Sequence, residues 1–330
     1  MTDPLRIHIK NNRLGEEVFR MTVERYEAAV ARHPDVAQRV NTSIEYDLDR
    51  FDECMADAVG LVTWDLPTTD LAARAPNLRW IHIIGAGIEH LQPLDWLPPE
   101  VTLTNNRGVH TRKSGEYGIM ALLMLNNAMP RLADAQKRHD FIECFTSSIG
   151  GKTLLVVGAG KMGSAVGKRA QQFDMHVIGV RRTAQPTAGF DEVLSSEALD
   201  HALPRADFIL VSAPSTPLTR GMIDARRIGL MKPGAGIINM GRASIIDYDA
   251  LTVALNDGRL GGAVLDVFDP EPLPPDSPLW DTPNLIMTPH MSSDDALTYT
   301  PDTLDLVFEN IERLLAGQPL KNQVDPAAGY

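Results

Sequence analysis

Four side chains that can bind an anion or transfer a proton follow short apolar runs in the second half of the chain: Arg242, Asp266, Glu271 and His290. If those runs are parallel strands, the four side chains lie near the carboxyl edge of one sheet, where open α/β sheets bind their ligands. Histidine exchanges protons near neutral pH, and arginine binds carboxylates through paired hydrogen bonds. The set therefore predicts acid–base chemistry beside a bound acid.

Three glycines follow the apolar run 154–157 with the spacing GxGxxG: Gly158, Gly160 and Gly163. A helical pattern over 164–172 and a second apolar run at 177–180 come next. Taken alone, the motif could also be a glycine-rich turn that binds no ligand. The order of strand, turn, helix and strand favours a dinucleotide-binding unit. The first glycine permits the turn, the second lets a pyrophosphate approach, and the third lets the helix pack closely on the strand.

The second run of this unit ends in Arg181 and Arg182. An NAD site usually presents an acid there to the ribose 2′-hydroxyl, and an acid would repel a 2′-phosphate. Two guanidinium groups would instead pair with that phosphate, at about 1.5–3 kcal/mol for each well-placed charge-assisted hydrogen bond. The pair predicts NADP(H), with NAD as the weaker alternative. The other interpretation is that both arginines are solvated surface charges.

A nicotinamide cofactor beside arginine, glutamate and histidine suits hydride transfer to a carbonyl. The carbonyl oxygen gains negative charge and needs a proton donor, the role expected of His290. Glu271 would favour the imidazolium and hold the ring, and Arg242 would bind a substrate carboxylate. Spacing alone leaves another interpretation open, in which His290 is a turn residue after Pro289 and Glu271 is solvated between two prolines.

The hydrophobic pattern predicts the elements that position these residues. Apolar runs alternate with helical patterns over residues 1–105, which indicates a small α/β domain with a parallel sheet. Its strands are expected at 5–9, 40–46, 59–64 and 80–84, and its helices at 16–31, 50–56 and 70–75. Later strands are expected at 208–211, 236–239, 263–265 and 285–287, and later helices at 113–129, 131–140 and 294–315. His82 and His90 are interpreted as packing or surface residues.

The composition narrows the class of protein. A chain of 330 residues can form two domains with separate cores. Its net charge of −12 argues against nucleic acid or an anionic membrane as a partner. Cys54 and Cys144 lack metal-ligand spacing, so we expect no metal site. They fit reduced thiols in the cytoplasm, and a disulfide between them is the alternative. No apolar run approaches the ~18–20 residues of a membrane span, and no signal peptide is expected.

Several sequence blocks in order resemble the D-isomer-specific 2-hydroxyacid dehydrogenase family. They are 151–163, 213–221, 231–235, 239–247, 266–272 and 288–290. Together the blocks span about residues 108–292, and the N-terminal third matches through the loop 85–88. The resemblance implies two doubly wound parallel-sheet α/β domains. These are a Rossmann cofactor domain over 108–290 and a flavodoxin-like substrate domain formed by 1–107 with 291–330, onto which the C-terminal helix folds back.

The resemblance also implies roles for individual residues. Arg242 would bind substrate and act in catalysis, Glu271 would be the partner carboxylate, and His290 the acid/base. Asp266 matches the position that contacts the nicotinamide carboxamide. The substrate-carboxylate loop would be formed by Ala86, Gly87 and Ile88. The expected cofactor site comprises Gly158, Ala159, Gly160, Lys161, Met162, Gly163, Arg181, Arg182, Thr183, Ala213, Pro214, Thr219, Met240, Gly241, Asp266 and His290.

Three positions depart from the family pattern. Arg181 replaces the usual acid, Ala243 replaces the glycine after the catalytic arginine, and Asp174 stands where a left-handed glycine is common.

We therefore expect an NADPH-preferring reductase of small 2-keto acids, similar to glyoxylate/hydroxypyruvate reductases, which would be a cytoplasmic homodimer. The alternatives are a relative acting on D-3-phosphoglycerate or phosphite, and a nucleotide-sensing binding protein similar to the corepressors that share this fold.

Overall fold

The computed structural model describes residues 3–326, which fold into two compact units. One unit comprises the residues up to His110 and from Asp294 onward, and the other comprises Thr111–Ser293. The chain thus crosses between units slightly later than the boundaries expected at 107–108 and 290–291. Residues 1–2 and 327–330 of the expected first domain lie outside the described part of the chain. No helix within residues 3–326 is long and apolar enough to cross a membrane.

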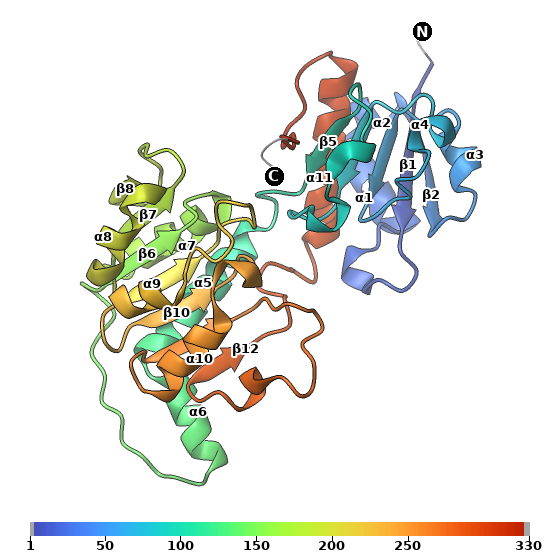
Figure 1. The fold of residues 1–330 in the computed structure, drawn as a ribbon. Coiled ribbons are helices and arrows are strands. Elements are labelled where there is room, and N and C mark those ends of the chain that lie inside the picture. Colours follow the sequence, from blue (N-terminus) through green and yellow to red (C-terminus); the bar gives the residue numbers. More distant parts are fainter. Residues whose placement is uncertain (1–2, 327–330) are drawn as a thin grey trace. The chain divides into compact units, whose positions relative to one another are not determined.

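The first unit is built on a parallel sheet of five strands in the order β2-β1-β3-β4-β5 (Figure 1). The strands are β1 (Leu5–Asn11), β2 (Val40–Tyr46), β3 (Gly60–Thr63), β4 (Trp80–Ile83) and β5 (Thr102–Asn105). The helices are α1 (Val23–Arg32), α2 (Pro34–Ala37), α3 (Phe51–Met55), α4 (Leu71–Arg74) and α11 (Tyr299–Leu315), with 3₁₀ turns at Glu17–Phe19, Glu89–Leu91 and Leu94–Trp96. This strand order is that of flavodoxin-like sheets, as expected.

Alternate residues of this sheet face two cores. Ile9 and Trp80 pack with the α11 residue Phe308 in one core, whereas Ile81 packs with the α3 residue Phe51 in the other. Both faces of the sheet are therefore covered, as is usual for a parallel sheet.

A buried polar network joins β4, β5 and α11 in the first unit. His82 Nδ1 lies 2.9 Å from Thr104 Oγ1, and Nε2 lies 3.0 Å from Asn106 Oδ1. Asn106 Nδ2 donates to Thr303 Oγ1 of α11 at 2.7 Å. Burial lowers the pKa of His82 to about 4, so its ring is neutral at physiological pH. His82 is therefore a hydrogen-bonded core residue, as predicted.

The second unit contains a parallel sheet of seven strands in the order β12-β11-β10-β9-β6-β7-β8. The strands are β6 (Thr153–Val157), β7 (His176–Arg181), β8 (Glu192–Ser195), β9 (Phe208–Val211), β10 (Gly236–Asn239), β11 (Gly262–Leu265) and β12 (Leu285–Met287). The helices are α5 (Thr111–Asn126), α6 (Met129–Lys137), α7 (Lys161–Gln171), α8 (Leu199–Ala202), α9 (Ala225–Leu230) and α10 (Tyr248–Asn256), with 3₁₀ turns at Ser196–Ala198, Leu203–Arg205, Ala243–Ile245 and Pro278–Asp281. The order is that of a Rossmann sheet with one added strand.

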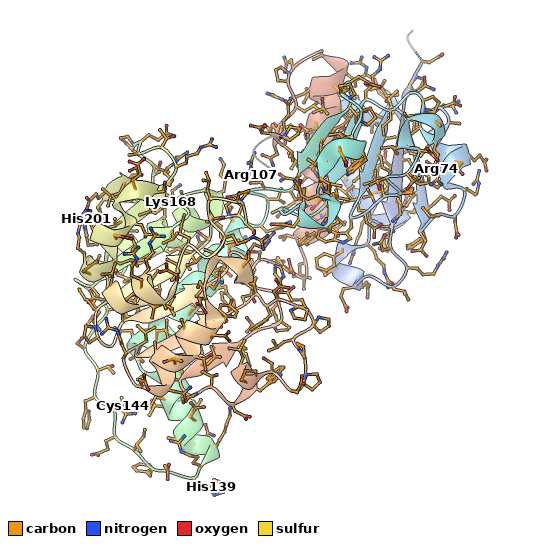
Figure 2. All side chains as sticks on the ribbon, in the orientation of Figure 1. Arg74, Arg107, His139, Cys144, Lys168 and His201 are labelled. Carbon is orange, nitrogen blue, oxygen red and sulfur yellow. The ribbon has the colours of Figure 1, made fainter. Side chains whose placement is uncertain are left out.

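The two faces of this second sheet also bury separate cores. Leu155 and Ile209 pack with the α10 residue Leu251 on one face. Val156 and Leu210 pack with the α7 residue Val166 on the other. After α6, residues 140–148 form neither helix nor strand and run along the outside of this unit, where Figure 2 labels Cys144 on them and His139 just before them.

Several expected elements differ from those observed. The helix expected over 16–31 begins only at Val23, because Thr22 caps it by accepting the Arg25 N–H. The last helix begins at Tyr299 rather than near residue 294, because the Asp295 carboxylate holds the N–H groups of 297 and 298 in a preceding turn. Helix α5 ends at Asn126 rather than 129. Strands β5 and β8 were not expected.

We predict that Gly118→Ala destabilises the second unit. Gly118 lies where α5 packs on α7, and a Cβ there would overlap both γ carbons of Val166, lying 2.8 Å from Cγ1. Overpacking costs about 1–3 kcal/mol, which exceeds the gain of up to about 1 kcal/mol in helix propensity. Urea unfolding followed by circular dichroism should show a lower midpoint. Gly229→Ala is the control, at an exposed position of α9 where no described atom outside the helix's own nearby backbone lies within 4 Å of the Cβ position. It should not lower the midpoint. Equal midpoints for both variants would contradict this account.

Candidate active site

The glycine loop follows β6 and leads into α7. Gly158 has a φ of +104°, and a Cβ there would lie 2.7 Å from the Ala213 Cα, so this turn requires glycine. A Cβ at Gly163 would lie 2.7 Å from Val156 Cγ1, so this glycine permits close packing of α7 on β6. Around Gly160, no atom of residues 3–326 other than those of Gly160 and its two chain neighbours lies within 4 Å of the Cβ position. The turn at Gly158 and the close packing at Gly163 agree with the sequence prediction. Gly160, the second glycine of the motif, borders open space.

Helix α7 begins directly at this open side. Gly160 is its N-cap residue, and no side chain within the described range caps the helix. The first N–H groups of a helix and the positive end of its dipole favour an anion. The loop therefore has the shape and the hydrogen-bond donors that a pyrophosphate requires.

The end of β7 carries positive charge. Arg181 is the last residue of this strand, and its Nη1 donates to Thr187 Oγ1 at 3.2 Å. Arg182 and Thr183 follow it and are exposed. Residues 184–191 continue as a loop into β8. A hollow of about 410 Å³ is lined by Ala184, Gln185, Pro186, Thr187, Ala188, Phe190, Asp191 and Val193. Two guanidinium groups therefore occupy the position at which an NAD site usually has a carboxylate. A carboxylate there would repel a phosphate.

The loops after β9 and β10 lie against the glycine loop. The Gly158 Cβ position overlaps the backbone of Ala213, and a Cβ at Gly241 would lie 2.7 Å from the Ala213 oxygen. Thr219 Oγ1 donates to the Pro214 oxygen at 2.6 Å, which closes the turn that follows β9. Met240 is buried beside this contact. The structure therefore brings together the predicted cofactor residues of the β6, β9 and β10 loops.

His290 and Glu271 form a direct pair. Strands β10, β11 and β12 are parallel neighbours, so the loops after them share one edge of the sheet. His290 Nδ1 lies 2.8 Å from Glu271 Oε2, and the Phe268 N–H donates to Glu271 Oε1 at 2.8 Å. An ionised carboxylate only accepts hydrogen bonds, so Nδ1 carries the shared proton. Nε2 is then the nitrogen that can exchange a proton with a ligand.

Arg242 follows β10 and is held through its backbone. Its carbonyl accepts from Asn239 Nδ2 at 3.1 Å, and its own Nη1 donates to the Gly241 oxygen at 2.8 Å. Asn239 Nδ2 also donates to the Tyr248 hydroxyl at 3.0 Å, which in turn donates to the Val267 oxygen at 2.7 Å. Arg242 itself is extended, with φ −140°. Ala243 begins a 3₁₀ turn, so the alanine in place of glycine needs no left-handed backbone here.

Asp266 is buried at the end of β11, with 1% of its surface exposed. Its Oδ1 accepts the Thr288 hydroxyl at 2.6 Å and the Met291 N–H at 3.0 Å, and its Oδ2 accepts the Ser292 N–H at 3.0 Å. Asp266 therefore holds the loop that contains His290.

Sequence reasoning missed four residues that support the site: Asn239, Tyr248, Thr288 and Tyr117. A buried asparagine at the end of the apolar strand β10 was a signal that could have identified Asn239. Tyr117 carried no such signal, because it lies in a long apolar helix far from Thr288 in the sequence.

The expected substrate-carboxylate loop lies in the first unit, after β4. The Ala86 oxygen accepts from Asn105 Nδ2 at 2.8 Å, Gly87 is partly exposed, and Ile88 is buried. Beside it, the Trp64 and His90 rings stack with centroids 4.2 Å apart, and His90 Nε2 lies 2.8 Å from the Trp64 oxygen. The loop is thus fixed by side chains of its own unit.

A Rossmann sheet and a glycine loop with an open side define a dinucleotide-binding protein, and a histidine–glutamate pair lies on the same sheet edge. Residues 119–292 match the family described as D-isomer specific 2-hydroxyacid dehydrogenase, NAD binding domain. The chain therefore belongs to the D-isomer-specific 2-hydroxyacid dehydrogenases, a family of NAD(P)-dependent oxidoreductases, and its second unit contains the NAD-binding domain.

Individual relatives agree with this membership. The chain is 31% identical over 263 residues to glyoxylate/hydroxypyruvate reductase B of Pectobacterium carotovorum, covering 78% of this chain and 82% of the relative. A family member from Xanthobacter autotrophicus, crystallised with NADPH and MES, superposes with a TM-score of 0.84 at 27% identity over 99% of this chain and 100% of the other. The NADPH-dependent glyoxylate/hydroxypyruvate reductase of Sinorhizobium meliloti, crystallised with NADP and sulfate, gives 0.81 at 27% identity over 98% and 99%.

A second group of relatives is considerably longer. The D-3-phosphoglycerate dehydrogenase of Mycobacterium bovis is 29% identical over 287 residues, and the match covers 86% of this chain and 54% of that enzyme. The chain therefore spans about half the length of these phosphoglycerate enzymes.

Proposed function

We propose that the protein uses NADPH to reduce a small 2-keto acid, such as glyoxylate or hydroxypyruvate, to the D-2-hydroxy acid. The observation that carries this proposal is the hydrogen bond between His290 Nδ1 and Glu271 Oε2, at the same sheet edge as the glycine loop. The names of the Pectobacterium and Sinorhizobium relatives support the substrate class.

The chain's own residues fit both the cofactor and the reaction. The cradle at Gly158, which a Cβ would fill, and the open side at Gly160 suit the pyrophosphate. Bound NADPH would supply the hydride to the carbonyl carbon. His290 Nε2 donates a proton to the carbonyl oxygen, and Glu271 stabilises the imidazolium that holds this proton beforehand. Arg242 binds the substrate carboxylate and stabilises negative charge on the carbonyl oxygen.

Other predicted contacts are part of the proposal. An ionised carboxylate offers about four acceptor positions, and the described hydrogen bonds of Asp266 use three of them. The remaining one can accept an N–H of the nicotinamide carboxamide. We assign contact with the substrate carboxylate to the backbone of Ala86, Gly87 and Ile88, and contact with the 2′-phosphate to Arg181 and Arg182.

We further propose a homodimer formed through the second unit. Residues 140–148 pass along the outside of this unit, and Phe141 and Phe145 are 100% and 90% exposed. Each aromatic side chain buries about 150–250 Å² in an interface, and a second copy would cover both. The two free thiols, Cys54 and Cys144, agree with the proposed cytoplasmic location.

We predict that NADPH is consumed rapidly with at least one of glyoxylate, hydroxypyruvate, pyruvate or phenylpyruvate, and more slowly with 3-phosphohydroxypyruvate. His290→Ala should lower turnover by about 10²–10⁴, the usual contribution of general acid–base catalysis. His290→Asn is the matched variant, because asparagine tolerates the left-handed backbone at this position, and it should lose as much. Absorbance at 340 nm measures both. Full activity of either variant would refute the role of His290, and a preference for 3-phosphohydroxypyruvate would favour the phosphoglycerate alternative.

We predict that Arg181→Asp weakens NADPH binding at least tenfold. The substitution removes one charge-assisted hydrogen bond, worth about 1.5–3 kcal/mol, and adds repulsion of the phosphate. NADH affinity should change little. Arg39→Asp, an exposed position of the first unit, makes the same change in net charge and should leave both affinities unaltered. Fluorescence titration of both nucleotides checks this, and unchanged NADPH affinity in Arg181→Asp would exclude the role of Arg181.

We predict that the double variant Phe141→Ser/Phe145→Ser shifts the protein from dimer to monomer. Stable interfaces bury about 800 Å² on each partner, and loss of two exposed aromatic anchors removes a large part of such an area. Sedimentation velocity over a concentration series measures the effect. Leu14→Ser, at a fully exposed apolar position of the first unit, is the control and should remain dimeric. A dimer that survives the double variant would place the interface elsewhere.

A further inference from the structure

We infer that Tyr117, Thr288 and Asp266 are positioning residues for His290, forming a hydrogen-bonded chain from helix α5 that fixes the loop carrying the imidazole. This inference rests on the proposed acid/base role of His290. It assigns a purpose in the reaction to Tyr117 and Thr288, and it gives Asp266 a second task besides contact with the cofactor.

The direction of each hydrogen bond in the chain follows from donor and acceptor capacity. The Thr288 hydroxyl donates to Asp266 Oδ1 at 2.6 Å, because an ionised carboxylate can only accept. The Tyr117 hydroxyl lies 2.6 Å from Thr288 Oγ1. The single proton of Thr288 is already used toward Asp266, so Tyr117 must donate to Thr288. Burial raises the pKa of Tyr117 to about 12, so its hydroxyl remains a donor across the working pH range.

The buried carboxylate at the end of this chain holds the backbone on both sides of His290. Thr288 precedes His290 by two positions, and Met291 and Ser292 follow it directly; all three donate to Asp266. The His290 N–H itself donates to the Thr288 oxygen at 3.0 Å. Among residues 290–292, the N–H groups of Met291 and Ser292 donate to the Asp266 carboxylate, whereas the N–H of His290 donates within the turn. The φ of His290 is +51°. A left-handed residue of this kind persists when its surroundings hold it.

Helix α5 contacts the same loop at a second point. The Ser114 hydroxyl lies 2.8 Å from the Ser293 hydroxyl, and Ser114 and Tyr117 are both buried. Residues three apart lie on one face of a helix, so α5 presents two hydroxyls to the segment 288–293. The imidazole ring is held separately by Glu271. Backbone and ring therefore have independent anchors, and loss of the backbone anchor should displace the whole side chain relative to a bound substrate.

The variants Thr288→Val and Thr288→Ser test this chain. Thr288→Val removes the donor to Asp266 with little change in shape, and we expect kcat to fall about tenfold to a hundredfold, the range that small misplacements of catalytic groups produce. The dissociation constant of NADPH should change less than threefold. Thr288→Ser keeps the hydroxyl and should restore most of the turnover. Tyr117→Phe leaves the Thr288 donor in place, so we expect a smaller loss of kcat, with unchanged NADPH binding.

Tyr26→Phe is the matched control. It also deletes a tyrosine hydroxyl 2.6 Å from a threonine hydroxyl, that of Thr42, but in the first unit and outside the proposed site. We expect its kcat to equal that of the wild type. Tyr117→Phe keeps the inference testable if Thr288→Val does not fold, and a wild-type kcat in Tyr117→Phe would then overturn it. A comparable loss of kcat in Tyr26→Phe would overturn the inference too.

A double-mutant cycle with His290→Ala separates positioning from a general structural effect. If Thr288 acts through His290, Thr288→Val should cause little further loss of kcat in the His290→Ala background. An equal loss in both backgrounds would overturn the inference. If His290→Ala lowers turnover but Thr288→Val does not, the inference fails and the proposed function stands. If His290→Ala keeps full turnover, the proposed function fails instead.

Discussion

The register of the parallel strands in the second unit determines where its functional groups lie. Val157, Val211, Asn239, Leu265 and Met287 form one continuous row across β6, β9, β10, β11 and β12. Val180 of β7 continues this row beside Val157. The next residue of each strand begins or borders a loop of the site, as with Gly158, Arg181, Asp266 and Thr288. A single row of backbone hydrogen bonds therefore aligns the glycine loop, the arginines and the His290–Glu271 pair at one edge.

The loops beyond this row depend on polar groups that are buried and hydrogen-bonded. A buried carboxylate without donors would cost several kcal/mol or would become protonated, yet Asp266 accepts from one hydroxyl and two backbone N–H groups. Asn239, which is fully buried, donates to the Arg242 carbonyl and accepts from the Gly241 N–H. The first unit also contains a buried, hydrogen-bonded asparagine, because Asn106 forms hydrogen bonds with His82 and Thr303. Buried polar residues thus fix the loops that apolar packing cannot position.

The sequence could predict the elements whose signal is local. Strands β9, β10 and β12 have the expected bounds because their apolar runs end in or before polar residues. Strand β2 also has the expected bounds, with apolar side chains at Val40, Ile44 and Tyr46 among polar ones. Strand β8 was not predicted because it is half-buried at the sheet edge and contains Glu192. Strand β5 was not predicted because Leu103 is the single apolar residue among its four positions. The start of α1 depends on the Thr22 side-chain cap, and the start of α11 depends on the turn that the Asp295 carboxylate stabilises before it. Helical periodicity indicates neither.

The same limit applies to the candidate site. His290 and Glu271 could be paired from the sequence, because each follows a recognisable strand within a known motif order. Tyr117 and Thr288 could not, since 171 positions separate them and their contact depends on how α5 packs against the sheet. Side chains that can transfer protons are recognisable by their residue type. The hydroxyl residues that position those side chains are of ordinary types, and their role becomes visible only from the packing.

Backbone strain at the site can be compared with the hydrogen bonds that oppose it. A non-glycine residue in the left-handed region costs roughly 1–2 kcal/mol, and both Asp174 and His290 adopt it, with φ of +58° and +51°. Asp174, predicted from its place in the sequence to tolerate this conformation, lies in an exposed turn where its carbonyl accepts the Gly151 N–H. At His290 the opposing interactions are stronger, because hydrogen bonds to a charged group contribute about 1.5–3 kcal/mol each, and the flanking residues make three of them to Asp266. The hydrogen bonds of the loop therefore stabilise it by more free energy than the strained histidine backbone costs. The same Asp266 carboxylate that offsets the strain also fixes the direction in which the imidazole leaves the backbone.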